Sequence, residues 1–297
     1  MILAPVLLFC YNRLWHINRT ISALRNNVYA DKTELFIFSD GPRNSDDARK
    51  ILHLREYLKK VDGFKKVTII EREMNGGISN SIINGVTELI NQYGKVIVLE
   101  DDMITSHYFI KYMNDALVLY ETENRVISIH GYVYPVKGKL PETFFLRGAD
   151  CWGWATWKRG WDLFEKDGGE LLNGMKEQKL INAFNFNGSF RYSRMLERQI
   201  KGKNDSWAIR WYASAFLKDK LTLYPGVSLV HNIGLDDSGT HCFKRDDYDV
   251  DVKDEPVRLE IIPIVESKVA RDSFEDFFRH GRKFAWGVIW KVLKGKV

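Results

Sequence analysis

Cysteine is scarce in this chain of 297 residues. Cys10, Cys151 and Cys242 show no CxxC spacing, so the sequence predicts neither a zinc site nor a disulfide framework. A reducing compartment such as the cytoplasm fits this cysteine usage best.

Long apolar runs and dense basic runs are also missing. No run after residue 10 is long enough to span a bilayer. Residues 1–10 are apolar but lack a basic leader and a small-residue cleavage site, so we predict a first strand there. The net charge of +5 is modest, and no Lys/Arg block with interleaved aromatics occurs in the main body. Nucleic acid is therefore not an expected partner.

An apolar run that ends in three carboxylates is the most informative stretch. Residues 96–99 are Val-Ile-Val-Leu, and Glu100, Asp101 and Asp102 follow directly. A continuous apolar run is typical of a strand buried on both faces, and ligands bind at the carboxyl ends of such strands. Adjacent carboxylates repel unless a hard divalent cation offsets them. The alternative is an acidic turn that caps a helix beginning near Ser106.

Polar groups follow the other predicted strands in the same way. Arg13 follows an apolar strand that ends at Tyr11, and Asp40 ends the strand that begins at Glu34. Gly76 and Gly77 open a predicted helix that contains Ser79, and free amides at a helix start favour phosphate. Arg13 could instead be a surface arginine, and the glycine pair could be only a turn. The regular spacing favours one polar rim on an α/β sheet.

Tryptophan marks the second half of the chain. Trp152, Trp154, Trp157 and Trp161 lie close together, and such rings either fill a core or pack on sugar rings. We predict that Trp154 is the exposed one. Asp205 precedes a predicted helix and is either its cap or a general base.

A histidine and a glycine-bracketed loop follow the last predicted strand. His231 is either a metal ligand or a structural residue. Residues 234–242 are bracketed by glycines and are typical of a flexible lid.

Together these motifs resemble a nucleotide-sugar glycosyltransferase with the GT-A fold, and are most similar to the inverting N-acetylglucosaminyltransferase I family. The resemblance covers roughly residues 3–245 and is most specific at the acidic triplet. It implies that the nucleotide is held by Arg13 and Asp40, the latter reading a uracil edge. The glycine pair with Ser79, and Trp154, would complete the nucleotide-sugar site.

The resemblance also implies roles for the acidic residues and the loop. Glu100 would touch the donor sugar, Asp101 the ribose and Asp102 the metal. Asp205 would be the base. Ser238 and His241 would belong to a lid that folds over the diphosphate, although the loop matches the family pattern loosely.

The implied architecture is an α/β GT-A domain over residues 1–255, with a mostly parallel central sheet flanked by helices. Residues 1–131 would form the nucleotide-binding half and residues 132–255 a smaller acceptor-side half. The implied reaction is Mn2+- or Mg2+-dependent, inverting transfer of a hexose or N-acetylhexosamine from a UDP-sugar to a glycan or lipid-linked acceptor.

Two other classes remain open at this point. A sugar nucleotidyltransferase would be expected to carry a Gly-rich basic loop after its first strand, which residues 11–14 are not. A non-catalytic carbohydrate- or metal-binding module would explain the tryptophans and acids without a nucleotide. Metal-dependent UDP binding separates the transferase from the module.

Residues 256–297 are predicted to form a helical tail. Apolar residues recur at helical spacing over residues 272–297, accompanied by lysines and arginines. Such a helix either docks on the catalytic domain, forms a homodimer interface, or lies on the inner face of a membrane with Trp286 and Trp290 at the headgroup level.

Overall fold

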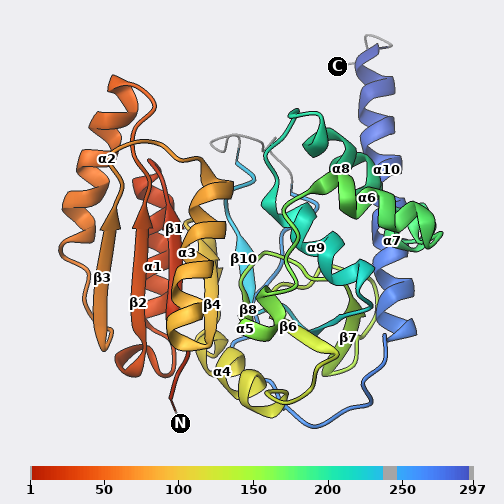
Figure 1. Cartoon of the computed structure of the whole chain (residues 1–297), viewed down its shortest axis with the longest axis horizontal. Coiled ribbons are helices and arrows are strands. Elements are labelled where there is room, and N and C mark those ends of the chain that lie inside the picture. Colours follow the sequence, from red (N-terminus) through yellow and green to blue (C-terminus); the bar gives the residue numbers. More distant parts are fainter. Residues whose placement is uncertain (1, 237–245, 294–297) are drawn as a thin grey trace.

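The computed structural model describes residues 2–236 and 246–293, with side chains described up to residue 280. At its centre is an eight-stranded sheet with the order β3-β2-β1-β4-β8-β6-β9-β7 (Figure 1). Its strands are β1 (Val6–Cys10), β2 (Glu34–Ser39), β3 (Lys66–Glu71), β4 (Lys95–Glu100), β6 (Val126–His130), β7 (Thr143–Arg147), β8 (Trp154–Trp157) and β9 (Leu221–Pro225). A separate antiparallel pair is formed by β5 (Met103–Thr105) and β10 (Val230–Asn232).

The sheet is mixed but mostly parallel. β1 pairs in parallel with β2 and β4, β2 with β3, and β6 with β9. Only β8 and β7 run in the opposite direction, through antiparallel pairs with β4, β6 and β9. The predicted α/β class with a mostly parallel sheet is therefore confirmed. Because β6 lies between β8 and β9, the two predicted halves of residues 1–255 share one sheet.

Helices cover both faces of this sheet and one of its edges (Figure 1). They are α1 (Leu14–Arg25), η1 (Ala30–Lys32), α2 (Ser45–Leu58), α3 (Ile78–Tyr93), α4 (Phe109–Leu119), α5 (Lys158–Trp161), α6 (Gly168–Glu177), α7 (Ile181–Phe184), α8 (Tyr192–Ile200), α9 (Trp207–Leu217) and α10 (Lys268–Leu293).

Alternation along the strands explains the layers. In β1, Val6 and Leu8 share a buried cluster with residues of α1 and α4, whereas Leu7 and Phe9 share another with residues of α3 and α9. Successive strand side chains point to opposite faces, so an unbroken apolar run is what a doubly covered strand requires. Residues 96–99 of β4 are buried for the same reason.

The starts of the helices decide two of the alternatives. α4 begins at Phe109, and β5 intervenes between it and the acidic triplet, so the triplet does not cap a helix. α9 is capped by Ser206, whose side chain accepts a hydrogen bond from the amide of Ile209. Asp205 therefore lies just before the cap and is not the cap itself.

The first turns of α10 dock on the protein. Ala270, Phe274 and Phe278 are buried in one cluster with Phe144 and Tyr224. The docked alternative is confirmed for these side chains. Side chains beyond residue 280, including Trp286 and Trp290, lie outside the described part.

Within the stretches of the chain that the structure describes, no helix is both long and apolar enough to cross a membrane.

Candidate active site

The candidate site lies at one edge of the sheet. β2, β1 and β4 are neighbours and parallel, so their carboxyl ends meet at the same edge. Asp40 follows β2, Arg13 immediately precedes α1 just after β1, and the acidic triplet begins at the last residue of β4. The topology therefore gathers the polar rim that the sequence predicts.

Arg13 binds two of the three carboxylates. Its Nη2 donates to Asp101 Oδ1 and, at 2.7 Å, to Asp102 Oδ2. Asp101 and Asp102 are 3% and 8% exposed, and charge-assisted hydrogen bonds are strong in such surroundings. The hydroxyl of Thr20 donates to the backbone carbonyl of Asp101 at 2.7 Å and so stabilises the backbone of the triplet. Arg13 is thus part of the site rather than a surface arginine.

The environment changes the protonation of this cluster. Burial, with the charges of Asp102 and Asp101, raises the pKa of Glu100 to about 8. Burial also raises the pKa of Asp101 to about 6, with Arg13 acting in the opposite direction and Asp102 adding to the increase. Burial lowers the pKa of Arg13, but the two carboxylates more than reverse this. Without a bound cation, therefore, Glu100 is largely protonated near pH 7.

The segment after β10 lies directly on the triplet. The amide of Ile233 donates to the carbonyl of Asp102 at 2.9 Å, and a Cβ added at Gly234 would collide with Asp102 Oδ2. Asp236 Oδ2 lies 3.1 Å from Nε2 of His16, a buried residue of α1. Because a Cβ at position 234 would collide with Asp102, only glycine fits there. Ser238 and His241, the predicted lid residues, lie outside the described part of the chain.

Asp40 holds the glycine loop. Its Oδ1 accepts from the amides of Gly41 (2.9 Å) and Gly76 (3.0 Å), and its Oδ2 accepts from Gly77 at 3.1 Å. Gly77 has a φ of +77°, in the left-handed region that favours glycine, and precedes the first turn of α3. The structure thus gives Asp40 an architectural role, and its contact with uracil stays a prediction.

Arg210 links this loop to Asp205. Its Nη2 donates to Ser79 Oγ at 2.6 Å and lies 3.7 Å from Asp205 Oδ1. A Cβ added at Gly77 would lie 3.8 Å from Asp205 Oδ2. The side chain of Asp205 is 61% exposed, which suits a residue that meets a second substrate. Arg210 was not predicted from the sequence, because its partner Ser79 lies 131 positions away.

Trp154 is not exposed, and that prediction is wrong. It is 0% exposed in β8 and packs against Trp161, Trp207 and Trp211 with ring centroids 5.8, 5.5 and 5.6 Å away. The reason is that β8 inserts between β4 and β6 at the middle of the sheet, which a tryptophan cluster in the sequence does not reveal. Trp154 therefore belongs to the core.

Trp152, two residues earlier, is half-buried and lines a cavity of about 380 Å³ that we call the aromatic cleft. Its lining residues are Tyr134, Ala149, Asp150, Cys151, Trp152, Phe190, Tyr192, Met195, Ala208, Ile209, Tyr212, Leu235 and Tyr248. The sequence analysis did not find this cleft, because its residues come from distant segments.

His231 lies in β10 opposite Ile104, and its Nδ1 is 3.0 Å from the carbonyl oxygen of Val250. In the described stretches, no three His, Cys, Asp or Glu side chains gather into a potential metal-binding group. The structure therefore does not bring His231 into a ligand group with the triplet.

The triplet nevertheless fits a hard cation. Asp101 Oδ2 is buried and has no hydrogen-bond partner among the described residues, and the donors are carboxylate oxygens. Mg2+ is typically held by one or two carboxylates together with substrate phosphates, so a larger protein ligand set is not needed.

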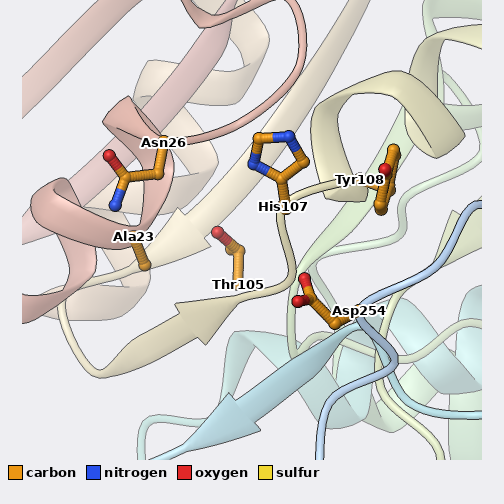
Figure 2. A pocket seen from close by; sticks show the side chains of 6 residues that line it. All are labelled: Ala23, Asn26, Thr105, His107, Tyr108 and Asp254. Atoms are coloured by element: carbon orange, nitrogen blue, oxygen red, sulfur yellow. The ribbon is translucent and has the colours of Figure 1, made fainter.

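A second hollow, of about 540 Å³, lies elsewhere (Figure 2). Asn26 from the end of α1 and His107, Tyr108 and Asp254 surround it. Arg13 precedes the other end of this 12-residue helix, and a helix of that length spans roughly 18 Å. This hollow is therefore not part of the strand-end site.

No protein family and no curated protein sequence matches the chain. Solved structures resemble parts of it. TarS from S. aureus, in complex with UDP, aligns with 15% identity and a TM-score of 0.33 over 47% of this chain and 38% of its own. A mannosyltransferase from Pyrobaculum calidifontis, in complex with GDP-Man and Mn2+, aligns with 12% identity and a TM-score of 0.31 over 44% of this chain and 36% of its own.

A cytidylyltransferase from Leptospira borgpetersenii aligns with 8% identity and a TM-score of 0.31 over 45% of this chain and 58% of its own. The chain thus spans less than two thirds of each of these proteins. Likenesses this weak assign neither a family nor an activity.

Proposed function

We propose that the chain is a GT-A glycosyltransferase of the inverting type that transfers a hexose or N-acetylhexosamine from a UDP-sugar to a hydroxyl of a glycan or lipid-linked glycan. The observation that carries the proposal is the arrangement at the sheet edge. One arginine after β1 binds two carboxylates after β4, with Asp40 and a glycine-opened helix beside them. Such an edge suits a diphosphate, which binds beside fixed cations and at the start of a helix.

The residues divide into a donor side and an acceptor side. Arg13 would meet the charge that develops on the departing diphosphate, and Asp101 would accept a hydrogen bond from a ribose hydroxyl. Glu100, at the end of β4, would contact the donor sugar. The glycine pair and Ser79 would position the donor at the start of α3.

Asp205 would act as the general base. It removes the proton of the acceptor hydroxyl as the new bond from that oxygen to the anomeric carbon forms and the bond to the diphosphate breaks. UDP leaves with the electron pair of the broken bond. A single displacement of this kind inverts the anomeric configuration.

A divalent cation, Mn2+ or Mg2+, would be held by Asp102 and would supply charge neutralisation at the donor diphosphate. His231 is a weaker candidate ligand. Ser238 and His241, in the glycine-bracketed loop of residues 234–242, are proposed as lid residues over the donor. We also propose that the protein works in the cytoplasm, where a lipid-linked acceptor would be met at the inner face of the membrane.

The test is calorimetric titration with UDP in the presence and absence of Mn2+, followed by a donor screen that detects UDP release from nucleotide sugars. We expect binding that requires Mn2+ and UDP release from one class of donor. Asp162→Asn, on an exposed face that pairs with Lys158, is a control and should bind UDP normally. Metal-dependent pyrophosphate release from UTP and a sugar phosphate would instead favour a nucleotidyltransferase. No UDP binding at all would contradict the transferase.

A further inference from the structure

The aromatic cleft has a composition unlike the rest of the site. Six of its lining residues are aromatic, each with a partly exposed ring: Tyr134, Trp152, Phe190, Tyr192, Tyr212 and Tyr248. Among its described lining residues, Asp150 is the only one with a charged side chain. Its volume of about 380 Å³ lies within the range of small-molecule pockets, roughly 300–1,000 Å³.

Two polar atoms face this apolar wall with hydrogen-bonding capacity to spare. Tyr212 Oη is buried and has no hydrogen-bond partner among the described residues. Asp150 Oδ1 accepts from the amide of Cys151 at 2.9 Å, but Oδ2 lies 3.9 Å from His130 Nε2, too far for a hydrogen bond. Buried polar atoms usually find partners, so Tyr212 Oη calls for a ligand that carries hydroxyl groups. Asp150, whose side chain is 26% exposed, can accept a hydrogen bond from the same ligand.

The cleft adjoins the proposed donor site on two sides. Leu235 lines it, while the preceding residue, Gly234, packs on Asp102. On the other side, Ala208 and Ile209 line it from the first turn of α9, which Asp205 directly precedes. A molecule in the cleft would therefore contact the segment that packs on Asp102 and the helix that follows Asp205.

We propose that the aromatic cleft binds an uncharged sugar ring of the acceptor, with its C–H face on Trp152 and the neighbouring tyrosines and a hydroxyl on Asp150 Oδ2. That the sugar is the acceptor of the reaction rests on the proposed function. Binding of the sugar to the cleft does not require the donor. Aromatic faces pack well on apolar faces of ligands, and a single carboxylate both accepts from hydroxyls and repels anions. The cleft therefore selects neutral sugars against those carrying carboxylates or phosphates.

The test is ligand-observed NMR titration of the full chain, without nucleotide, with methyl glycosides of the common hexoses and N-acetylhexosamines. Methyl glucoside and methyl glucuronide form a matched pair that differs by one carboxylate. We expect at least one neutral glycoside to bind, and the glucuronide to bind at least about tenfold more weakly than the glucoside if the glucoside is a ligand. Trp152→Ala should weaken binding of the neutral ligand about tenfold.

Asp150→Asn serves as the second variant, because it keeps the packing of the cleft. It should weaken the neutral ligand about tenfold and reduce the discrimination against the glucuronide. Asp254→Asn, in the hollow of Figure 2, is the control and should bind like the unmodified chain. The proposal is overturned if no neutral glycoside binds with a Kd below roughly 10 mM, or if neither cleft variant changes the affinity.

The same samples keep this proposal separate from the transferase proposal. UDP titration reports the strand-end rim, whereas the glycosides report the cleft. Glycoside binding without UDP binding would support the sugar site in the cleft and contradict the transferase proposal. UDP binding without glycoside binding would support the transferase proposal and contradict the sugar site in the cleft.

Discussion

The two sides of the candidate site, the strand-end rim and the aromatic cleft, differ in the kind of side chain that lines them. The strand-end rim presents Arg13, Asp40 and the acidic triplet within one edge of a parallel sheet. The aromatic cleft presents six rings and a single carboxylate, drawn from segments between residues 134 and 248. The rim suits a highly charged ligand held by electrostatics, and the cleft suits a neutral one held by shape and ring contact.

The difference also has a structural cause. Strand ends in a parallel sheet are fixed by many hydrogen-bonded neighbours, so charges there can be held against their mutual repulsion. The cleft instead forms where α8, α9 and the segment after β10 meet, with α10 behind it. Phe278 of α10 packs against Phe190 with ring centroids 4.9 Å apart, and Phe190 lines the cleft. The cleft therefore depends in part on the docked tail.

The largest effect is expected on the charged side. Asp102→Asn removes the proposed cation ligand and should lower the transfer rate by roughly a thousandfold or more, because several kcal/mol of charge stabilisation disappear. A strong chelator should have the same effect on the unmodified chain, with recovery on adding Mn2+. UDP release in a fixed-time assay measures both. Full activity in the presence of chelator would contradict the metal-dependent mechanism.

Asp205→Asn tests the acceptor side of the same reaction. Loss of a general base lowers rates by roughly 100- to 10,000-fold, and we expect turnover to fall within that range. UDP affinity measured by calorimetry should stay unchanged, because Asp205 would act on the acceptor. Equal losses in rate and UDP affinity would place Asp205 on the donor side instead.

Sequence reasoning found the rim because its signals are local. A strand that is apolar without interruption and then ends in carboxylates is visible in seven consecutive residues, and the sheet order then brings Arg13 and Asp40 beside it. The sequence could not show that the carboxylate oxygens of Asp40 accept hydrogen bonds from the amides of Gly76 and Gly77. That contact joins residues more than thirty positions apart and depends on a loop conformation.

The cleft escaped prediction for the opposite reason. Trp152 and Trp154 are indistinguishable in the sequence, and only the insertion of β8 between β4 and β6 buries one and leaves the other at a surface. The buried Arg210 was missed because arginine is usually exposed, and its partner Ser79 is 131 positions away. This side of the site is formed by contacts between residues far apart in the sequence, and no local sequence pattern predicts such contacts.

Removal of the docked tail contact should have a smaller effect, on stability rather than on chemistry. Phe274 is 1% exposed and packs against Tyr134 and Phe144, so Phe274→Ala should destabilise the fold by about 3–5 kcal/mol. Val269→Ala, at an exposed position of the same helix, should change stability by less than about 0.5 kcal/mol. Urea denaturation followed by tryptophan fluorescence measures both. Equal stability of the two variants would show that α10 is not docked in solution.

The smallest effect concerns His130, which lies at the end of β6 with its Nε2 3.9 Å from Oδ2 of the cleft residue Asp150. It is 0% exposed, neither ring nitrogen has a hydrogen-bond partner among the described residues, and Tyr224 packs against its ring. Burial lowers the pKa of His130 to about 4, with Asp150 opposing the shift. The folded state therefore keeps this histidine neutral at pH values where the unfolded chain, with an ordinary pKa of about 6.5, takes up a proton.

Because the unfolded state binds more protons over this window, stability should fall as the pH decreases from about 6.5 towards 4. Between pH 7.5 and 5 the contribution of His130 amounts to about 2 kcal/mol. His130→Gln cannot take up this proton, so its unfolding free energy should depend on pH less steeply than that of the unmodified chain by about this amount. His107→Gln, at an exposed position in the hollow of Figure 2, is the matched control and should keep the original dependence. Urea denaturation at the two pH values measures this dependence. Parallel pH profiles for the unmodified chain and His130→Gln would show that burial does not keep His130 neutral in the folded state.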